Sequence, residues 1–380
     1  MSETTVLEPL GYTPRWRALF ADFSAHADRD HLQPGRVVRA DRGSVLVACA
    51  AGIVRAEPSA RLLKAAGRPG GGVAAAPGAA PPGVVPVTGD WVALHAPPGL
   101  EVPLVEAVLE REGAIERGAP GETSDHQVLV ANVDVVFVVE PIADEPNQRR
   151  VERELALAWE SGAVPVVVLT KADLAADPSA ALASVETVAI GVDVHVTSAP
   201  SGRGVAPLRS YARAHRTIAL IGRSGAGKST LVNALLGEER QATGAVRASD
   251  GRGRHVTVAR ELIPLPGGGV LLDTPGLRSL GLTESSSGIA AAFADVEELA
   301  AACRFNDCSH TSEPGCAVLR AVDEGELPSD RLASYHKLQR EARVAAMKTD
   351  ARLRAEEVRK WKIIHKSVRA HMRQTGKDGW

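Results

Sequence analysis

The chain has 380 residues and a formal net charge of −2, which is enough length for roughly two to four domains with substantial cores. Only 3% of its residues are aromatic, which argues against RNA-binding modules that stack bases on aromatic side chains. Neither a long apolar run nor an N-terminal segment with a basic start and an apolar centre is present, so the sequence predicts no membrane span and no secretory signal, and we expect a cytoplasmic protein.

The first part of the chain predicts a β-rich domain. After an N-terminal extension over residues 1–33, short apolar runs begin at Arg36, Val45, Gly52, Asp90 and Leu104. Five short strands of this kind suit a small closed barrel such as an OB-fold, which we assign to residues 34–114. A stretch rich in Gly, Ala and Pro over residues 64–83 interrupts them and predicts a mobile, low-complexity loop.

From residue 115 the pattern changes to alternating strands and helices. Strands and helices are predicted in turn over residues 133–139, 147–161, 166–169, 179–188 and 192–196. This α/β alternation predicts a mostly parallel sheet with helices on both faces, in a domain over residues 115–283. Ligands of such sheets bind at the carboxyl ends of the strands.

Two polar segments follow strands of this domain. They comprise Thr170, Lys171, Ala172 and Asp173, and then Thr197, Ser198 and Ala199. A carboxylate at Asp173 can accept hydrogen bonds from the N1–H and amino group of guanine, a donor pair that adenine lacks. The aliphatic stem of Lys171 can cover the base plane, and backbone N–H groups at Ser198 and Ala199 can reach the guanine oxygen. The two segments therefore predict guanine recognition.

A phosphate-binding loop of the pattern G-x-x-x-x-G-K-S follows the apolar residues 218–221 and precedes a predicted helix. It comprises Gly222, Arg223, Ser224, Gly225, Ala226, Gly227, Lys228 and Ser229, and Thr230 leads into the helix. Its glycines let successive N–H groups point at phosphate oxygens, and the helix N-terminus completes the anion site. Lys228 supplies a positive charge for the β- and γ-phosphates, and Ser229 supplies a hydroxyl for Mg²⁺.

Two later segments complete the predicted nucleotide site. Asp273-Thr-Pro-Gly276 follows the apolar residues 270–272, so that Asp273 can hold Mg²⁺ and Gly276 can offer its N–H to the γ-phosphate. The polar, Gly-rich residues 237–261 lie where a switch loop belongs, and Thr257 is the candidate for a second Mg²⁺ ligand. We therefore expect Mg²⁺ with GTP, and catalytic roles for Lys228, Thr257 and Gly276.

A metal site is predicted in the C-terminal domain, residues 284–380. Three of the four cysteines and one histidine fall close together as Cys303, Cys308, His310 and Cys316. Three thiolates and an imidazole suit one tetrahedral, structural Zn²⁺ per chain. The fourth cysteine, Cys49, lies in an apolar run and is expected to be a small core residue.

The C-terminal tail is basic. From Arg331 to Trp380 there are 14 Lys and Arg against 5 Asp and Glu. This excess predicts a surface that binds a polyanion such as RNA, on a chain that is otherwise acidic.

The nucleotide motifs resemble those of TRAFAC-type GTPases, but their order is reversed, with the base motif before the phosphate loop. The chain therefore resembles a circularly permuted GTPase. With the barrel and the Cys-Cys-His-Cys segment, it closely resembles the bacterial RsgA family, also called YjeQ or YloQ. Matching stretches over about residues 34 to 345 include 132–134, 251–255, 264–269 and 305–318.

The resemblance implies an OB-fold, a permuted GTPase domain and a helical zinc domain. It also implies a monomer that acts late in assembly of the small (30S) ribosomal subunit and binds 16S rRNA near the decoding region. Hydrolysis of GTP to GDP, stimulated by the subunit, would then promote release of the factor.

Three positions depart from the family pattern. Thr170 stands where Asn is usual, as in signal-recognition GTPases, so guanine specificity is expected with weaker binding. Two valines replace threonines beside Thr257, which keeps the Mg²⁺ role. Leu277 after the Asp-Thr-Pro-Gly segment cannot orient an attacking water, so a group from His255 or from the ribosome is expected to do so.

Three alternatives stay open at this point. The first is a GTPase that acts on the large ribosomal subunit or on tRNA. The second is a zinc-containing RNA-binding module in which the nucleotide is only structural. The third is a metabolic ATP-dependent kinase. Subunit co-sedimentation, a Lys228 variant and the nucleotide preference of an Asp173 variant separate them.

Overall fold

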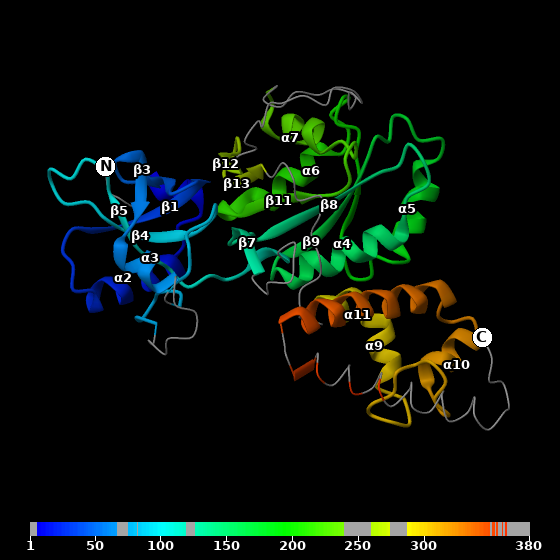
Figure 1. The fold of residues 1–380 in the computed structure, drawn as a ribbon. Coiled ribbons are helices and arrows are strands. Elements are labelled where there is room, and N and C mark those ends of the chain that lie inside the picture. Colours follow the sequence, from blue (N-terminus) through cyan, green and yellow to red (C-terminus); the bar gives the residue numbers. More distant parts are fainter. Residues whose placement is uncertain are drawn as a thin grey trace, which may run out of the picture.

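The structure is a computed structural model, and it describes residues 6–66, 75–81, 83–118, 126–238, 260–273 and 287–349, together with Arg352, Leu353, Ala355, Arg359 and Lys362. Within these ranges, every helix is too short or too polar to cross a lipid bilayer. The described residues form a mixed α/β fold with three parts along the chain, shown in Figure 1.

The N-terminal part contains the predicted closed barrel of five strands. Its strands are β1 (Leu32–Asp41), β2 (Ser44–Cys49), β3 (Gly52–Pro58), β4 (Trp91–His95) and β5 (Leu104–Val108). The order is β1-β2-β3-β5-β4, and β1 also pairs with β4, which closes the barrel. Alternate valines and leucines of these strands fill its interior, together with buried Cys49.

Two segments that the sequence left without structure pack on this barrel. Residues 6–26 lie in the predicted extension and form η1 (Glu8–Leu10) and α2 (Pro14–His26), from which Trp16 stacks on Trp91 with ring centroids 5.8 Å apart. Helix α3 (Ala60–Ala66) enters the predicted low-complexity loop, and residues 75–81 rejoin the barrel where the Ala80 N–H donates to the Val108 carbonyl at 2.8 Å.

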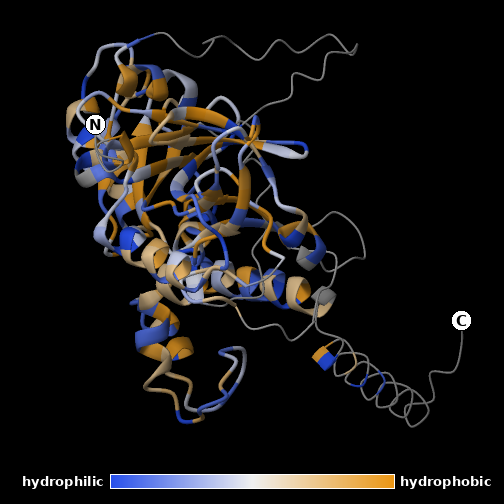
Figure 2. Cartoon of the chain, turned by 90° about the vertical axis from the view of Figure 1, so that its left-hand side faces the viewer, coloured by the Kyte–Doolittle hydropathy of each residue, from blue (hydrophilic) through white to orange (hydrophobic). Residues whose placement is uncertain are grey.

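The central part is a parallel sheet with helices on both faces, as predicted. Its strands are β8 (Val135–Pro141), β9 (Val164–Thr170), β10 (Val194–Val196), β11 (Thr217–Ile221) and β13 (Val270–Asp273), with β12 (Glu261–Pro264) antiparallel to β13. The order β10-β9-β8-β11-β13-β12 places the strand before the phosphate loop in the centre. The strands are mostly apolar and covered by helices, as Figure 2 shows.

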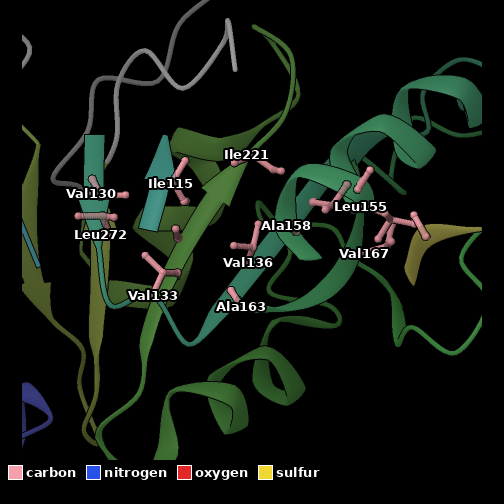
Figure 3. Close-up of a cluster of buried hydrophobic side chains, with 14 of the residues drawn as sticks. Ile115, Val130, Val133, Val136, Leu155, Ala158, Ala163, Val167, Ile221 and Leu272 are labelled. Carbon is pink, nitrogen blue, oxygen red and sulfur yellow. The ribbon is translucent and has the colours of Figure 1, made fainter. Parts of the chain in front are cut away.

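Alternation along β8 explains the two layers. Val136 and Val138 pack with Leu155 of α4 (Gln148–Glu160) and with α5 (Pro178–Glu186), and Figure 3 shows part of this cluster. The intervening residues of β8 pack with α6 (Val205–Arg209), η2 (Ser210–His215) and α7 (Lys228–Leu236). Asn147 begins α4, because its side chain accepts a hydrogen bond from the Arg150 N–H.

The barrel is joined to the central sheet in two ways. Strand β1 pairs with β12, where Arg39 lies opposite Glu261, so the two sheets are continuous. In addition, the fully buried guanidinium of Arg36 donates to the Leu10 carbonyl and, at 2.6 Å, to the Thr217 hydroxyl at the start of β11. The hairpin of β6 (Ala114–Gly118) and β7 (His126–Ala131) links the two parts along the chain.

The C-terminal part consists of helices packed beside α4. They are α8 (Ser287–Ala292), α9 (Ala294–Ala300), α10 (Ala317–Asp323) and α11 (Ser329–Thr349), and Figure 1 shows α11 alongside α4. Arg331 of α11 is buried and donates to Glu152 of α4 at 2.8 Å and to Asp295 of α9 at 2.8 and 3.0 Å. This ion-pair network fixes α11 on the central domain.

Candidate nucleotide site and metal centre

The predicted nucleotide motifs meet at one edge of the central sheet. Strands β8, β9, β10 and β11 are parallel neighbours, so the loops that follow them leave from the same edge. The phosphate loop follows β11, and the segments at Thr170 and Thr197 follow β9 and β10. Motifs that are distant in sequence thus lie side by side, at the place where parallel sheets bind ligands.

The phosphate loop owes its curvature to three glycines. Gly222, Gly225 and Gly227 have φ of 143°, 78° and 91°, values that residues with a Cβ rarely adopt. A Cβ on Gly222 would also lie 2.4 Å from the Val139 carbonyl oxygen, so glycine is required where β11 leaves the sheet. Helix α7 begins at Lys228, and its first N–H groups therefore face the space enclosed by the loop.

Lys228 lies inside the curve of this loop. Its Nζ donates to the carbonyl oxygens of Gly222 and Arg223 at 2.6 and 2.7 Å. These bonds hold the ammonium group over the loop, where it can meet phosphate oxygens. Ser229 and Thr230, the other predicted binding residues, lie in the first turn of α7 and are half-buried.

The base motif is attached directly to the phosphate loop. The buried Thr170 hydroxyl at the end of β9 donates to the Ala226 carbonyl at 2.5 Å. Lys171 follows with φ of 61°, in the left-handed region, and the Ala172 N–H donates to the Thr197 carbonyl at 3.1 Å. These contacts fix the loop that carries Asp173 relative to the phosphate loop.

Asp173 is exposed at this edge, while Ser198 is buried beside it. The Ser198 hydroxyl donates to Asp173 Oδ1 at 2.7 Å, which orients the carboxylate. Ala199, half-buried, follows Ser198 in the same loop. The two segments predicted to read the base are therefore in direct contact.

Two carboxyl groups near this site went unnoticed in the sequence. Glu140, next to the last residue of the apolar strand β8, is buried and accepts hydrogen bonds from the Asn147 N–H and from Arg150, both at 3.1 Å. Burial, and next the neighbouring charge of Glu140, raise the pKa of Glu154 on α4 to about 8, while Lys228 opposes this rise. The one sequence signal for these two groups was that Glu140 stands at the end of an apolar run, where a charged residue can face a ligand site.

Several predicted residues lie outside the described part of the chain. These are His255, Thr257 and Gly276, together with Leu277. Asp273 ends β13, which is the parallel neighbour of β11, so its backbone lies at the edge of the sheet that carries the phosphate loop.

The four predicted metal ligands lie together. The ligand atoms of Cys303, Cys308, His310 and Cys316 are all within 4.8 Å of one another. The Sγ atoms of Cys303 and Cys316 are 3.8 Å apart, and His310 Nδ1 lies 3.6 and 3.4 Å from them. Zn–S and Zn–N bonds of usual length in a tetrahedron give edges of about 3.8 Å for S···S and about 3.5 Å for S···N, so the cluster fits Zn²⁺.

Neighbouring groups support these ligands. The Ala317 N–H at the start of α10 donates to Cys303 Sγ at 3.3 Å, and the Leu319 N–H donates to Cys316 Sγ at 3.4 Å. Such bonds stabilise thiolates, the form of cysteine that binds metals. The site is enclosed by protein ligands, which is the pattern of a structural rather than a catalytic metal.

Replacement of Thr170 by Val is expected to weaken GTP and GDP binding about tenfold. The exchange removes the hydrogen bond that holds the base-motif loop against the phosphate loop. Nucleotide binding must then also order the two loops, and a hydrogen bond of about 1.4 kcal/mol corresponds to about tenfold in affinity. Titration with a fluorescent guanine nucleotide measures the effect. Thr187→Val, at the exposed end of α5, is the control, and equal affinities of the two variants would show that the bond does not matter.

A family model and the sequences of known proteins point to the same family. The model of the family described as RsgA GTPase matches residues 108–283. The small ribosomal subunit biogenesis GTPase RsgA of Streptomyces avermitilis is 46% identical over 364 residues, which is 95% of this chain and 92% of that protein. The protein of the same name from Opitutus terrae is 41% identical over 382 residues, covering 98% and 99%.

Two solved structures share the fold. YjeQ from Thermotoga maritima matches with a TM-score of 0.59 and 24% identity, over 82% of this chain and 98% of that one. YloQ, described as a circularly permuted GTPase, matches with a TM-score of 0.58 and 22% identity, over 83% and 97%. Both likenesses extend over nearly the whole length of the solved chains.

Proposed function

The chain belongs to the RsgA family of GTPases, and from this premise we propose that it is a late assembly factor of the small ribosomal subunit. In this proposal it binds 16S rRNA in the cytoplasm as a monomer. GTP hydrolysis, accelerated by the subunit, then drives its release.

One observation carries the proposal. The barrel, the permuted nucleotide site and the Cys-Cys-His-Cys cluster occur in one chain that aligns over 95% of its length with a small ribosomal subunit biogenesis GTPase. An RNA-binding module or a kinase would not account for all three parts together. The alternative of a GTPase acting on the large subunit or on tRNA is disfavoured, because the relatives named above act on the small subunit.

The proposed chemistry follows from the positions of the residues. Loop N–H groups, the N-terminus of α7 and Lys228 would hold the phosphates and stabilise charge in the transition state. Mg²⁺, bound with GTP, would neutralise phosphate charge, with Ser229 as a ligand and Asp273 and Thr257 completing the set. Gly276 would bind the γ-phosphate, and His255 or the ribosome would orient the attacking water.

We also propose Zn²⁺ for the Cys303 cluster, and domain limits of 1–33, 34–114, 115–283 and 284–380. The tetrahedral spacing of the ligands supports the metal. The change from barrel strands to the β6–β7 hairpin at Ala114 supports the first limit of the GTPase domain, and the start of α8 at Ser287 supports its second. The basic tail would add contacts to rRNA.

Purified small subunits are expected to raise the rate of GTP hydrolysis by at least about tenfold, because Leu277 cannot orient an attacking water and the subunit would supply or position the group that does. Phosphate release measured with and without small or large subunits tests this. Lys228→Ala should be inactive in both cases. Equal rates with and without small subunits, or stimulation by large subunits alone, would contradict the proposal.

A further inference from the structure

One carboxylate organises the loop that carries the metal ligands. Glu313 lies between His310 and Cys316 in sequence and accepts hydrogen bonds with both of its oxygens. Its Oε1 accepts from the Ser309 N–H at 3.0 Å and from the Ser309 hydroxyl. Its Oε2 accepts from the N–H groups of Thr311 at 2.9 Å and Ser312 at 3.0 Å.

These bonds surround a strained ligand. His310 has φ of 54°, in the left-handed region that residues with a side chain adopt only where their surroundings hold them there. Ser309 and Thr311 flank His310, so Glu313 accepts hydrogen bonds from the backbone on both sides of it. That backbone conformation places the His310 imidazole against Cys303 and Cys316 Sγ.

The carboxylate itself is separate from the ligand set. The cluster within mutual reach comprises Cys303, Cys308, His310 and Cys316, and among the described residues Glu313 is not part of it. The carboxylate is instead engaged by the amide groups and the Ser309 hydroxyl, which lower the pKa of Glu313, the hydroxyl most. A negatively charged group with this role resembles the outer partners that orient ligands at metal sites.

A contact from α11 supports the same backbone. The Nε2 atom of His336 lies 3.2 Å from the His310 carbonyl oxygen, to which it can donate a hydrogen bond. The His310 backbone is therefore held by Glu313 through the N–H groups of Ser309 and Thr311, and its carbonyl is held in addition by α11. The metal loop is shaped by groups other than the metal ligands.

We propose that Glu313 is the positioning residue of the metal centre, which fixes the His310 backbone so that the imidazole meets the three thiolates. The inference rests on the proposed zinc site. It adds that the fourth ligand is pre-organised by Glu313 and not by the metal alone. Loss of the carboxylate therefore weakens metal binding without removing a ligand.

The experiment measures Zn²⁺ affinity of the full chain by competition with a chromophoric chelator. Glu313→Gln is expected to bind zinc about 10–100-fold more weakly than the wild type. The matched control is Glu326→Gln, which removes an exposed carboxylate of the same domain and should leave the affinity unchanged. Guanine nucleotide binding at the phosphate loop verifies that each variant is folded.

A second variant distinguishes the effect of the position of the Glu313 carboxylate from the effect of its negative charge. Glu313→Asp keeps the negative charge but is one methylene too short to reach both sets of N–H groups, so it should bind zinc as weakly as Glu313→Gln. Co²⁺ loaded into either variant should keep the absorption of a three-thiolate site, because all four ligands remain.

Three results would overturn the inference. These are wild-type affinity in Glu313→Gln, wild-type affinity in Glu313→Asp, and a Co²⁺ spectrum that shows a lost ligand. A wild-type chain that takes up no zinc would contradict the metal centre itself, and the inference with it.

Discussion

Exchange of Asp173 for Asn is expected to turn the nucleotide preference from GTP to xanthosine triphosphate. The carboxylate is proposed to accept two hydrogen bonds from guanine, whereas the Asn amide would offer one donor and one acceptor, which match xanthine. Sites that read a base by hydrogen bonds discriminate by about 10⁴-fold. Because Ser198 donates to Oδ1 of Asp173, the Asn side chain keeps an oxygen for that bond, and the loop should stay in place.

Competition of GTP, ATP and xanthosine triphosphate against a fluorescent nucleotide measures this preference. The matched control is Asp144→Asn, an exposed carboxylate in the loop after β8, which should remain specific for GTP. If the Asp173 variant keeps its GTP affinity and gains none for xanthosine triphosphate, the base is read elsewhere. Tight ATP binding by the wild type would favour the kinase alternative instead.

Replacement of Arg331 by Met is expected to lower the free energy of unfolding by about 3–5 kcal/mol. Arg331 and Glu152 have side chains only 3% exposed, and Met would leave Glu152 buried with no ion pair from α11. The guanidinium also lies 4.3 Å above the Phe293 ring and bonds the Ala292 carbonyl at 2.9 Å. Its loss therefore weakens the attachment of α11 to both α4 and α8.

Urea unfolding of the full chain measures this loss. Arg340→Met, exposed on the same helix, should change stability by less than about 0.5 kcal/mol. The double variant Arg331→Met with Glu152→Met should recover part of the loss, because the carboxylate that lost its ion pair is then removed as well. Similar unfolding of Arg331→Met and Arg340→Met would mean that the network contributes little.

Local patterns in the sequence were sufficient for much of the fold and the site. The β-rich pattern, the alternation after residue 115 and the glycines of the phosphate loop each depend on neighbours in sequence, and the structure has barrel, parallel sheet and curved loop where they were predicted. The same holds for the start of α4, where Asn147 is the cap. The spacing of the Cys and His residues was likewise informative, because metal ligands cluster in short loops.

Features that depend on distant contacts were not predictable in this way. Arg331 was counted with the basic tail expected to bind RNA, but the structure buries it among carboxylates. A charge count cannot distinguish an exposed arginine from a paired one. From the sequence alone, Arg36 would be expected on the exposed face of a strand. In the structure it is buried, and its hydrogen-bond partners are the distant residues Leu10 and Thr217. The pairing of β1 with β12 has no local signal either.

The contact between Arg36 and Thr217 has a consequence for the order of folding during synthesis. The two residues are 181 positions apart. At a translation rate of about 5–20 residues per second, Thr217 is therefore synthesised roughly 10–40 seconds after Arg36. A fully buried cation without its acceptors is costly. The nascent barrel therefore reaches its final packing only when the strand before the phosphate loop has emerged, so the first domain made is not complete before the second has begun to form.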